Sequence, residues 1–170
     1  MRLKIVRFVP KDWNRIKTQM MYLENKCFPP AQQMTEQETK ECMTAPGAVA
    51  YLATNNGAVI GNTYGNVLST VDKEWFDGHW DPATYKRDRA GTVYITSTAV
   101  HPIFRRQGIA RKLKIAMIRD LKRRGFRFVV GHAHKGPMLK LNESLGARVI
   151  KKFPHWYGSK QTHYLYEIEL

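Results

Sequence analysis

The segment Arg105–Ala110, with the sequence RRQGIA, contains residue types that can hold a phosphate group. Small residues at Gly108 and Ala110 allow the backbone to approach a ligand closely. An amphipathic pattern begins at Gly108, and the exposed amides at the start of a helix form an anion site. The segment lacks both the G-x-x-x-x-G-K-[ST] of a P-loop and the G-x-G-x-x-G of a dinucleotide-binding turn. We therefore predict a pyrophosphate site that belongs to neither of those classes.

The basic residues of the chain are concentrated around this segment. The 170 residues include 28 Lys and Arg against 14 Asp and Glu, which gives a net charge of +14. Residues 101–160 hold 16 of the basic residues and two of the acidic ones, so they account for the whole excess. A ligand with several phosphates would be steered there, although any single Lys or Arg can equally be a solvated side chain on a helix.

Hydrophobic periodicity predicts strands and helices along the whole chain, which we interpret as one domain covering residues 1–170. Strands are expected over residues 3–9, 48–54, 58–68, 92–100, 126–134, 147–153 and 162–170. Helices are expected after the caps Asp12 and Thr35 and over residues 108–124 and 137–146. Asn56-Gly57 indicates a hairpin, and residues 69–91 show no period and predict a long loop. The strand-helix-strand unit at residues 92–134 should be parallel and right-handed.

Several classes of protein are disfavoured by the composition. No apolar run approaches the roughly 20 residues of a membrane-spanning helix. Charges at Arg2, Lys4 and Arg7 interrupt the first apolar stretch, so we expect no secretory signal and a cytoplasmic protein. Cys27 and Cys42 cannot form a disulfide framework and lack the spacing of metal ligands, so no metal is expected.

The segment also resembles a known signature. The pattern [QR]-x-x-G-x-[GA] after a strand that ends in Val-x-Pro is similar to the acyl-CoA-binding signature of GNAT-superfamily N-acetyltransferases. The matching residues are Val100, Pro102, Arg105, Gly108 and Ala110. The ESLGA sequence around Gly146 and the order of the elements also resemble that family. The resemblance implies a single-domain α/β (α+β) fold: a mixed, mostly antiparallel seven-stranded sheet flanked by about four helices, with the parallel unit at its centre.

The resemblance further implies an acyl-CoA-dependent enzyme that moves the acetyl group of acetyl-CoA directly to a primary amine. Residues implied in cofactor binding are Ala99, Val100, Arg105, Arg106, Gln107, Gly108, Ile109, Ala110 and Arg111. Backbone amides around Val100 would stabilise the oxyanion. The acceptor can be a small amine or a protein amine, and a homodimer is left open. The alternative is a non-enzymatic basic module that binds nucleic acid, which would need stacking aromatics, whereas Phe104, Phe126 and Phe128 fit core positions.

Two positions depart from the family pattern. A Tyr that many relatives carry before the last turn is replaced by Asn142, and a carboxylate often found in the central strand is replaced by Thr96. An amine acceptor is mostly protonated at neutral pH, so a base or a water chain must remove a proton. His134, with His132 two residues before it on the same strand face, is our candidate base, and structural histidines are the alternative. Tyr157 is a candidate general acid, with packing beneath a loop as the alternative.

The acceptor is expected to contact the loop at residues 69–91, which we place over the acceptor cleft. Asp77, Trp80 and Asp81 combine acidic groups with an indole face, which suits a cationic amine. The alternative is an exposed acidic loop whose aromatic residues pack onto the core.

Overall fold

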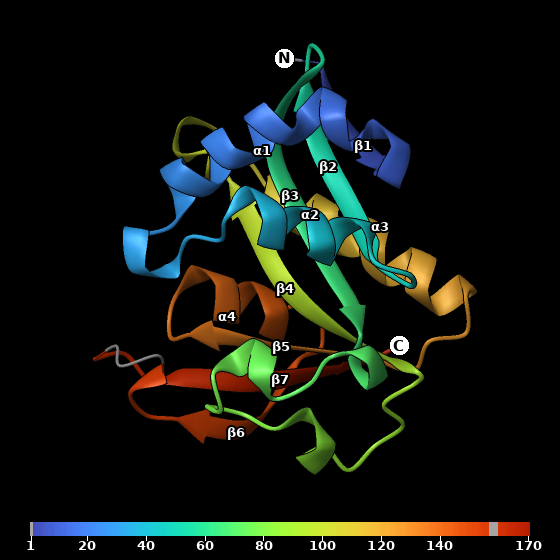
Figure 1. Cartoon of the computed structure of the whole chain (residues 1–170), viewed down its shortest axis with the longest axis vertical. Helices are drawn as coiled ribbons and strands as arrows, with labels where there is room; N and C mark the ends of the chain where they lie inside the picture. Colours follow the sequence, from blue (N-terminus) through green and yellow to red (C-terminus); the bar gives the residue numbers. More distant parts are fainter. Residues whose placement is uncertain (1, 157–159) are drawn as a thin grey trace. The chain divides into compact units, whose positions relative to one another are not determined.

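The computed structural model describes residues 2–156 and 160–170 and contains one seven-stranded sheet with the strand order β1-β2-β3-β4-β5-β7-β6 (Figure 1). Its strands are β1 (Leu3–Arg7), β2 (Val49–Asn55), β3 (Ala58–Val67), β4 (Thr92–Val100), β5 (Phe128–His134), β6 (Arg148–Phe153) and β7 (His163–Glu169). Its α-helices are α1 (Trp13–Cys27), α2 (Glu36–Thr44), α3 (Ile109–Arg123) and α4 (Pro137–Glu143). Among the described residues, no helix combines the length and the apolar character needed to cross a bilayer.

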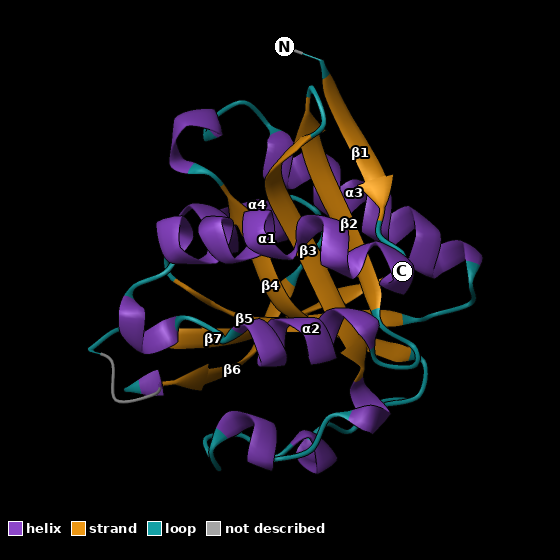
Figure 2. Cartoon of the chain, turned by 45° about the horizontal axis from the view of Figure 1, so that its top comes forward, coloured by secondary structure: helices purple, strands orange, loops and turns teal. Residues whose placement is uncertain are grey.

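The pairing of the strands confirms the predicted mixed sheet. Strands β1, β2 and β3 pair antiparallel, as do β5 with β7 and β7 with β6. Strands β4 and β5 run parallel, in a register from Thr92 opposite Phe128 to Ile95 opposite Gly131. Helix α3 joins these two strands, because the end of one parallel strand is far from the start of the next. Figure 2 shows the strands and their connecting helices by type.

The contacts within the chain divide it into two compact units. The first contains residues 1–66 and 96–120, and its helices α1 and α2 pack their apolar side on β2 and β3 around Trp13, Met20 and Tyr64. Helix α3 lies on the other face of these strands, where its Leu113 would be 3.4 Å from a Cβ on Gly61. This unit carries the end of β4 and the predicted phosphate segment.

The second unit contains residues 67–95 and 121–170. The predicted long loop belongs to it and holds only short 3-10 turns, at Leu68–Thr70, Glu74–Phe76 and Pro82–Thr84. Its aromatic residues are nevertheless buried, because Phe76, Trp80 and Tyr85 pack with Tyr94 and Val130 of the sheet. The prediction of one domain over residues 1–170 stays a prediction.

Most local signals are confirmed. The Thr35 hydroxyl accepts a hydrogen bond from the Glu38 amide at 3.2 Å, and the Glu38 carboxylate accepts one from the Thr35 amide, which completes the capping box. Asp12 differs, because it precedes α1 but makes no side-chain cap and instead lies 3.3 Å from Arg15.

One basic residue of α3 differs from the solvated side chain that is typical of a basic amphipathic helix. The amphipathic pattern of this helix predicts an apolar stripe of Ile109, Leu113, Ala116, Met117 and Leu121, of which all are buried except the half-buried Ala116. Lys114, however, is only 4% exposed, because the covered side of the helix is wider than the apolar stripe. Desolvation lowers the pKa of the Lys114 amine to about 7. Of the three Phe residues assigned to the core, Phe128 is buried, while Phe104 and Phe126 are half-buried.

Candidate functional site

The segment between β4 and α3 forms a loop of outward-facing backbone amides. Lys112 is the first helical residue whose amide bonds back, to the carbonyl of Gly108 at 3.0 Å. Within the described part of the chain, the amides of residues 106–110 have no backbone acceptor. The first amides of any helix lack a partner in this way, and they carry the positive end of the helix dipole. The loop therefore has the donors that a pyrophosphate requires.

Gly108 keeps this loop open. Its φ is +73°, a conformation that residues with a side chain rarely adopt, and nothing lies within 4 Å of where its Cβ would be. Arg106 also has a positive φ, of 65°. Residues 105–108 are exposed, so the first part of the loop is accessible to a ligand. The amide of Arg105 differs from its neighbours, because it donates to the carbonyl of Pro102 at 3.2 Å.

The end of β4 is tied to this loop and to α1 through one carbonyl. The oxygen of Val100 accepts a hydrogen bond from Nε of Arg105 at 3.1 Å and another from the thiol of Cys27 at 3.4 Å. Burial raises the pKa of the Cys27 thiol above its usual value, and the nearby Arg105 only partly offsets this effect. Cys27 therefore stays a thiol at neutral pH and is a poor nucleophile.

Glu24 is a buried carboxylate that sequence analysis did not identify. It lies one turn before Cys27 on α1 and is only 3% exposed. One of its oxygens accepts a hydrogen bond from the Met34 amide at 3.0 Å, and burial raises the pKa of the carboxyl group. Its charge also reaches Cys27, which places it near the end of β4. No sequence pattern marks Glu24 as buried, because a Glu beside the apolar stripe of a helix usually faces solvent.

His132 lies inside an aromatic cluster in the second unit. Its ring stacks on Trp156 with centroids 4.0 Å apart, and Trp80 and Phe153 contact it edge-on. Its Nδ1 lies 3.0 Å from the Tyr94 hydroxyl. Desolvation lowers the pKa of His132 to about 3, so the imidazole stays neutral and is a weak proton acceptor.

His134, two residues further along β5, is exposed at the end of the strand. It pairs in register with His163 of β7, and the two rings meet edge to face with centroids 5.7 Å apart. Burial lowers the pKa of His163. His163 was missed at the sequence level, since only the β5–β7 register brings it beside His134.

Asn142 and Thr96, the two positions that depart from the family pattern, are both at least partly buried. Asn142 is fully buried on α4, and neither polar atom of its side chain has a hydrogen-bond partner among the described residues. Burial raises the pKa of Tyr166, so this phenol keeps its proton. Thr96 is half-buried in β4. The candidate general acid Tyr157 lies outside the described residues.

The predicted acceptor residues lie in different surroundings. Trp80 is 3% exposed and packs against His132 and Phe76, so its indole faces belong to the core. Asp77 and Asp81 are exposed, and the Asp81 carboxylate accepts a hydrogen bond from the Ala83 amide at 2.8 Å. The aromatic residue thus behaves as in the alternative interpretation, while the two carboxylates remain accessible. Across residues 2–156 and 160–170, no group of three or more His, Cys, Asp or Glu could hold a metal ion.

Comparison with known proteins identifies the family of this arrangement. Residues 17–136 match the sequence model described as the acetyltransferase (GNAT) family. No curated protein sequence matches the chain.

Many solved structures share the fold at low sequence identity. The ribosomal-protein-S18-alanine N-acetyltransferase of Escherichia coli has a TM-score of 0.75 and 16% identity, over 98% of this chain and 93% of that one. NAA60 of Arabidopsis thaliana in complex with acetyl-CoA has a TM-score of 0.72 and 16% identity, over 99% and 98%. The NatC complex bound to Gag peptide and CoA has a TM-score of 0.76 and 16% identity, over 100% and 99%.

Proposed function

The chain belongs to the acetyltransferase (GNAT) family, and from this premise we propose that it transfers the acetyl group of acetyl-CoA directly to a primary amine. The observation that carries the proposal is the row of amides at residues 106–110, which have no backbone acceptor in the described structure. A pyrophosphate on these amides would also meet the positive end of the α3 dipole. The exposed Arg106 and Arg111 stand at the same loop and carry charges that suit the phosphates of acetyl-CoA.

The transfer needs a neutral amine and no covalent enzyme intermediate. The amine nitrogen attacks the thioester carbonyl carbon, the new C–N bond forms as the C–S bond breaks, and CoA leaves as its thiolate or thiol. The state of the cysteines supports direct attack, because burial raises the pKa of Cys27 and raises that of Cys42 to about 12. Neither thiol supplies a thiolate at neutral pH.

The ammonium proton must first pass to a base. We propose His134, which is exposed at the end of β5, in preference to the neutral and enclosed His132. Glu24 is the second candidate, because it is a buried carboxylate near the end of β4 with a raised pKa. Tyr157 stays the candidate that returns a proton to the thiolate.

Cofactor binding is tested by calorimetric titration with acetyl-CoA. We expect wild-type protein to bind and the variant Gly108→Asp to lose binding at least about tenfold, because an anionic side chain would occupy the pyrophosphate loop. Gly57→Asp is the matched control: Gly57 also has a positive φ, of 88°, and open space around it, but it lies at the β2–β3 hairpin. Equal loss in both variants, or no binding by folded wild type, would contradict the proposal.

The activity is then tested by thiol release with a panel of amines that includes a polyamine, an aromatic amine and peptides with free α-amines. Asp77→Asn with Asp81→Asn should raise the KM of a cationic acceptor if these exposed carboxylates contact it. A basic nucleic-acid module would instead bind DNA or RNA with a steep salt dependence that acetyl-CoA does not compete away.

A further inference from the structure

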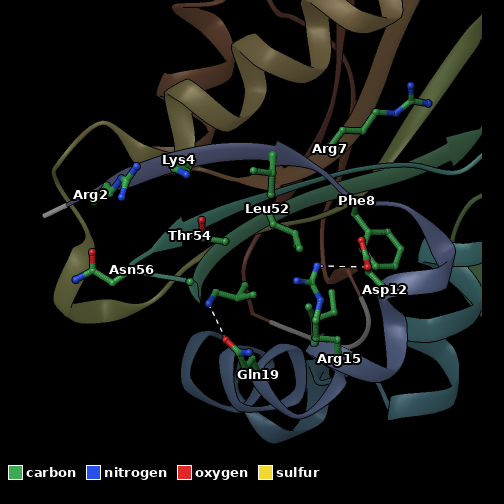
Figure 3. Close-up of a pocket in the computed structure, with 14 residues that line it drawn as sticks. Arg2, Lys4, Arg7, Phe8, Asp12, Arg15, Gln19, Leu52, Thr54 and Asn56 are labelled. Carbon is green, nitrogen blue, oxygen red and sulfur yellow. Dashed lines mark hydrogen bonds and ion pairs between the residues drawn. The ribbon is translucent and has the colours of Figure 1, made fainter.

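A cavity of about 680 Å³ lies in the first unit, beside β1, and shares no residue with the proposed acetyl-CoA loop (Figure 3). Its walls are the face of β1 and β2, the first two turns of α1 and the tip of the β2–β3 hairpin. This volume is within the usual range for pockets that bind small organic molecules. We call it the N-terminal pocket.

The pocket exists because α1 leaves the edge strand uncovered. Gln19 of α1 accepts a hydrogen bond from the Val59 amide at 2.7 Å, which fixes the helix over β2 and β3. Val6 pairs in register with Leu52 and therefore shares its face of the sheet. Leu52 is 4% exposed beneath the helix, whereas Val6 is 38% exposed. Beside the helix, the sheet thus presents Val6 as a partly exposed apolar side chain on the same face as Leu52.

The floor of the pocket is apolar and its rim is cationic. Phe8, Ile16 and Leu52 are buried side chains that contribute to the floor, and Val6 extends it toward solvent. The rim carries Arg2, Lys4 and Arg15, against a single acidic lining residue, Asp12.

The charges on the rim are only partly neutralised. Arg15 lies 3.3 Å from Asp12, and Figure 3 shows its side chain rising from α1 toward the strands. Arg7 also lines the pocket, but Figure 3 shows its side chain extending away from α1, and its Nε lies 3.9 Å from the Asp120 carboxylate. Within residues 2–156 and 160–170, no carboxylate lies within ion-pair distance of the Lys4 or Arg2 side chain. The pocket therefore keeps an excess of positive charge above an apolar floor.

We propose that the N-terminal pocket binds an amphipathic organic anion, whose acyl or aryl body packs on Val6, Phe8 and Leu52 and whose acidic head group pairs with Lys4 and Arg15. A purely ionic ligand such as inorganic phosphate would leave the apolar floor exposed to water. A neutral apolar ligand would make no use of the excess positive charge on the rim. The combination of surfaces thus favours a ligand that carries both features.

The probe for this site is 8-anilinonaphthalene-1-sulfonate, an aryl anion whose fluorescence rises in apolar surroundings. The titration is run in saturating CoA, which blocks the proposed acetyl-CoA loop. We expect wild-type protein to bind the probe at one site, and octanoate but not 1-octanol to displace it. Probe binding that occurs only when CoA is left out, or equal displacement by octanol and octanoate, would overturn the proposal, because the probe would then occupy the acetyl-CoA loop or ignore the charge.

Charge reversal on the rim supplies the decisive comparison. Lys4→Glu with Arg15→Glu should weaken probe binding at least about tenfold, which corresponds to about 1.4 kcal/mol. The matched control is Lys40→Glu with Lys86→Glu, which makes the same change in net charge at two exposed lysines that do not line the pocket. Equal weakening in both double variants would overturn the proposal, since only the net charge would then matter.

A measurement on wild-type protein covers the case in which the rim variant does not fold. Amide chemical shifts followed by NMR during an octanoate titration should move at Leu52, Thr54 and Val59. They should stay fixed at Gly108 and Ile109 of the acetyl-CoA loop. The reverse pattern would overturn the proposal.

Discussion

Nε of Arg105 donates a hydrogen bond to the carbonyl oxygen of Val100, 3.1 Å away, so the first residue of the phosphate segment holds the end of β4 by its side chain. Arg105 therefore positions the loop through this hydrogen bond in addition to contributing a positive charge. Its guanidinium fixes the start of the loop, and the amides of residues 106–110 follow directly. A neighbouring arginine with the same charge but no such bond makes this role testable.

Arg105→Ala should weaken acetyl-CoA binding by about tenfold, because it removes both a charge and the bond that positions the loop. Arg106→Ala removes the same charge from an exposed neighbour and should cost less. Calorimetric titration at two salt concentrations separates the two effects, since screening reduces the contribution of charge and leaves the positioning effect. Equal losses for both variants at high salt would show that the Val100 bond does not position the loop.

His134→Gln should lower kcat by about 100-fold and leave the KM for acetyl-CoA nearly unchanged, because a general base acts in the transition state. The variant should also lose one ionisation from the pH profile of kcat, measured by thiol release. His163→Gln is the matched control at the paired position on β7. A profile that keeps the same ionisation after His134→Gln would exclude His134 as the base.

Glu24→Gln tests the second candidate base. We expect this variant to be more stable than wild type, whether or not its kcat falls. Burial raises the pKa of Glu24 in the folded protein above its value in the unfolded chain. The protonated group therefore favours folding at a pH below the unfolded pKa. This contribution to stability is lost as the pH rises through the folded pKa. A neutral Gln keeps an oxygen for the Met34 amide and avoids the buried charge. We expect stability in urea to rise by about 1 kcal/mol at neutral pH, with a smaller gain near pH 4. If kcat also falls at least about tenfold, Glu24 takes part in the proton transfer, whereas an unchanged kcat would leave it a structural role.

Features encoded by neighbouring residues could be predicted from the sequence. The capping box consists of two hydrogen bonds between Thr35 and Glu38, which are three positions apart in the sequence. The Asn56-Gly57 turn depends only on its own backbone conformation. The geometry of the proposed acetyl-CoA loop also depends on neighbouring residues, because Gly108 and the first turn of α3 determine it. The fold class could be inferred before any tertiary contact was known, because the order of these elements and the family resemblance together implied it. The role of residues 105–111 in cofactor binding stays a prediction.

Features that depend on packing could not be predicted in the same way. Asp12 has the residue type of an N-cap, but a nearby Arg15 takes its carboxylate. Trp80 has the residue type of a cation-binding surface, but the core around His132 buries it. The pairing of His134 with His163 depends on the β5–β7 register, and the N-terminal pocket depends on how far α1 covers the sheet. None of these relations leaves a periodic or short-range signal.

Lys114 offers the sharpest test of a position that the sequence assigned to the wrong face of a helix. Burial lowers its folded pKa to about 7 from an ordinary value of 10.5, so between these limits the unfolded chain binds more protons than the folded one. Stability must therefore rise with pH across this window, by up to about 1.4 kcal/mol per unit from this group alone.

Lys114→Met removes the group, so its unfolding free energy in urea should rise less steeply than that of wild type between pH 7.5 and 9.5. The variant should also be more stable, and the difference should be largest at the lower pH. Lys112→Met, at an exposed neighbouring position, is the control, and its unfolding free energy should change with pH as that of wild type does. Parallel curves for wild type and Lys114→Met would show instead that the pKa of Lys114 is not lowered in the folded protein.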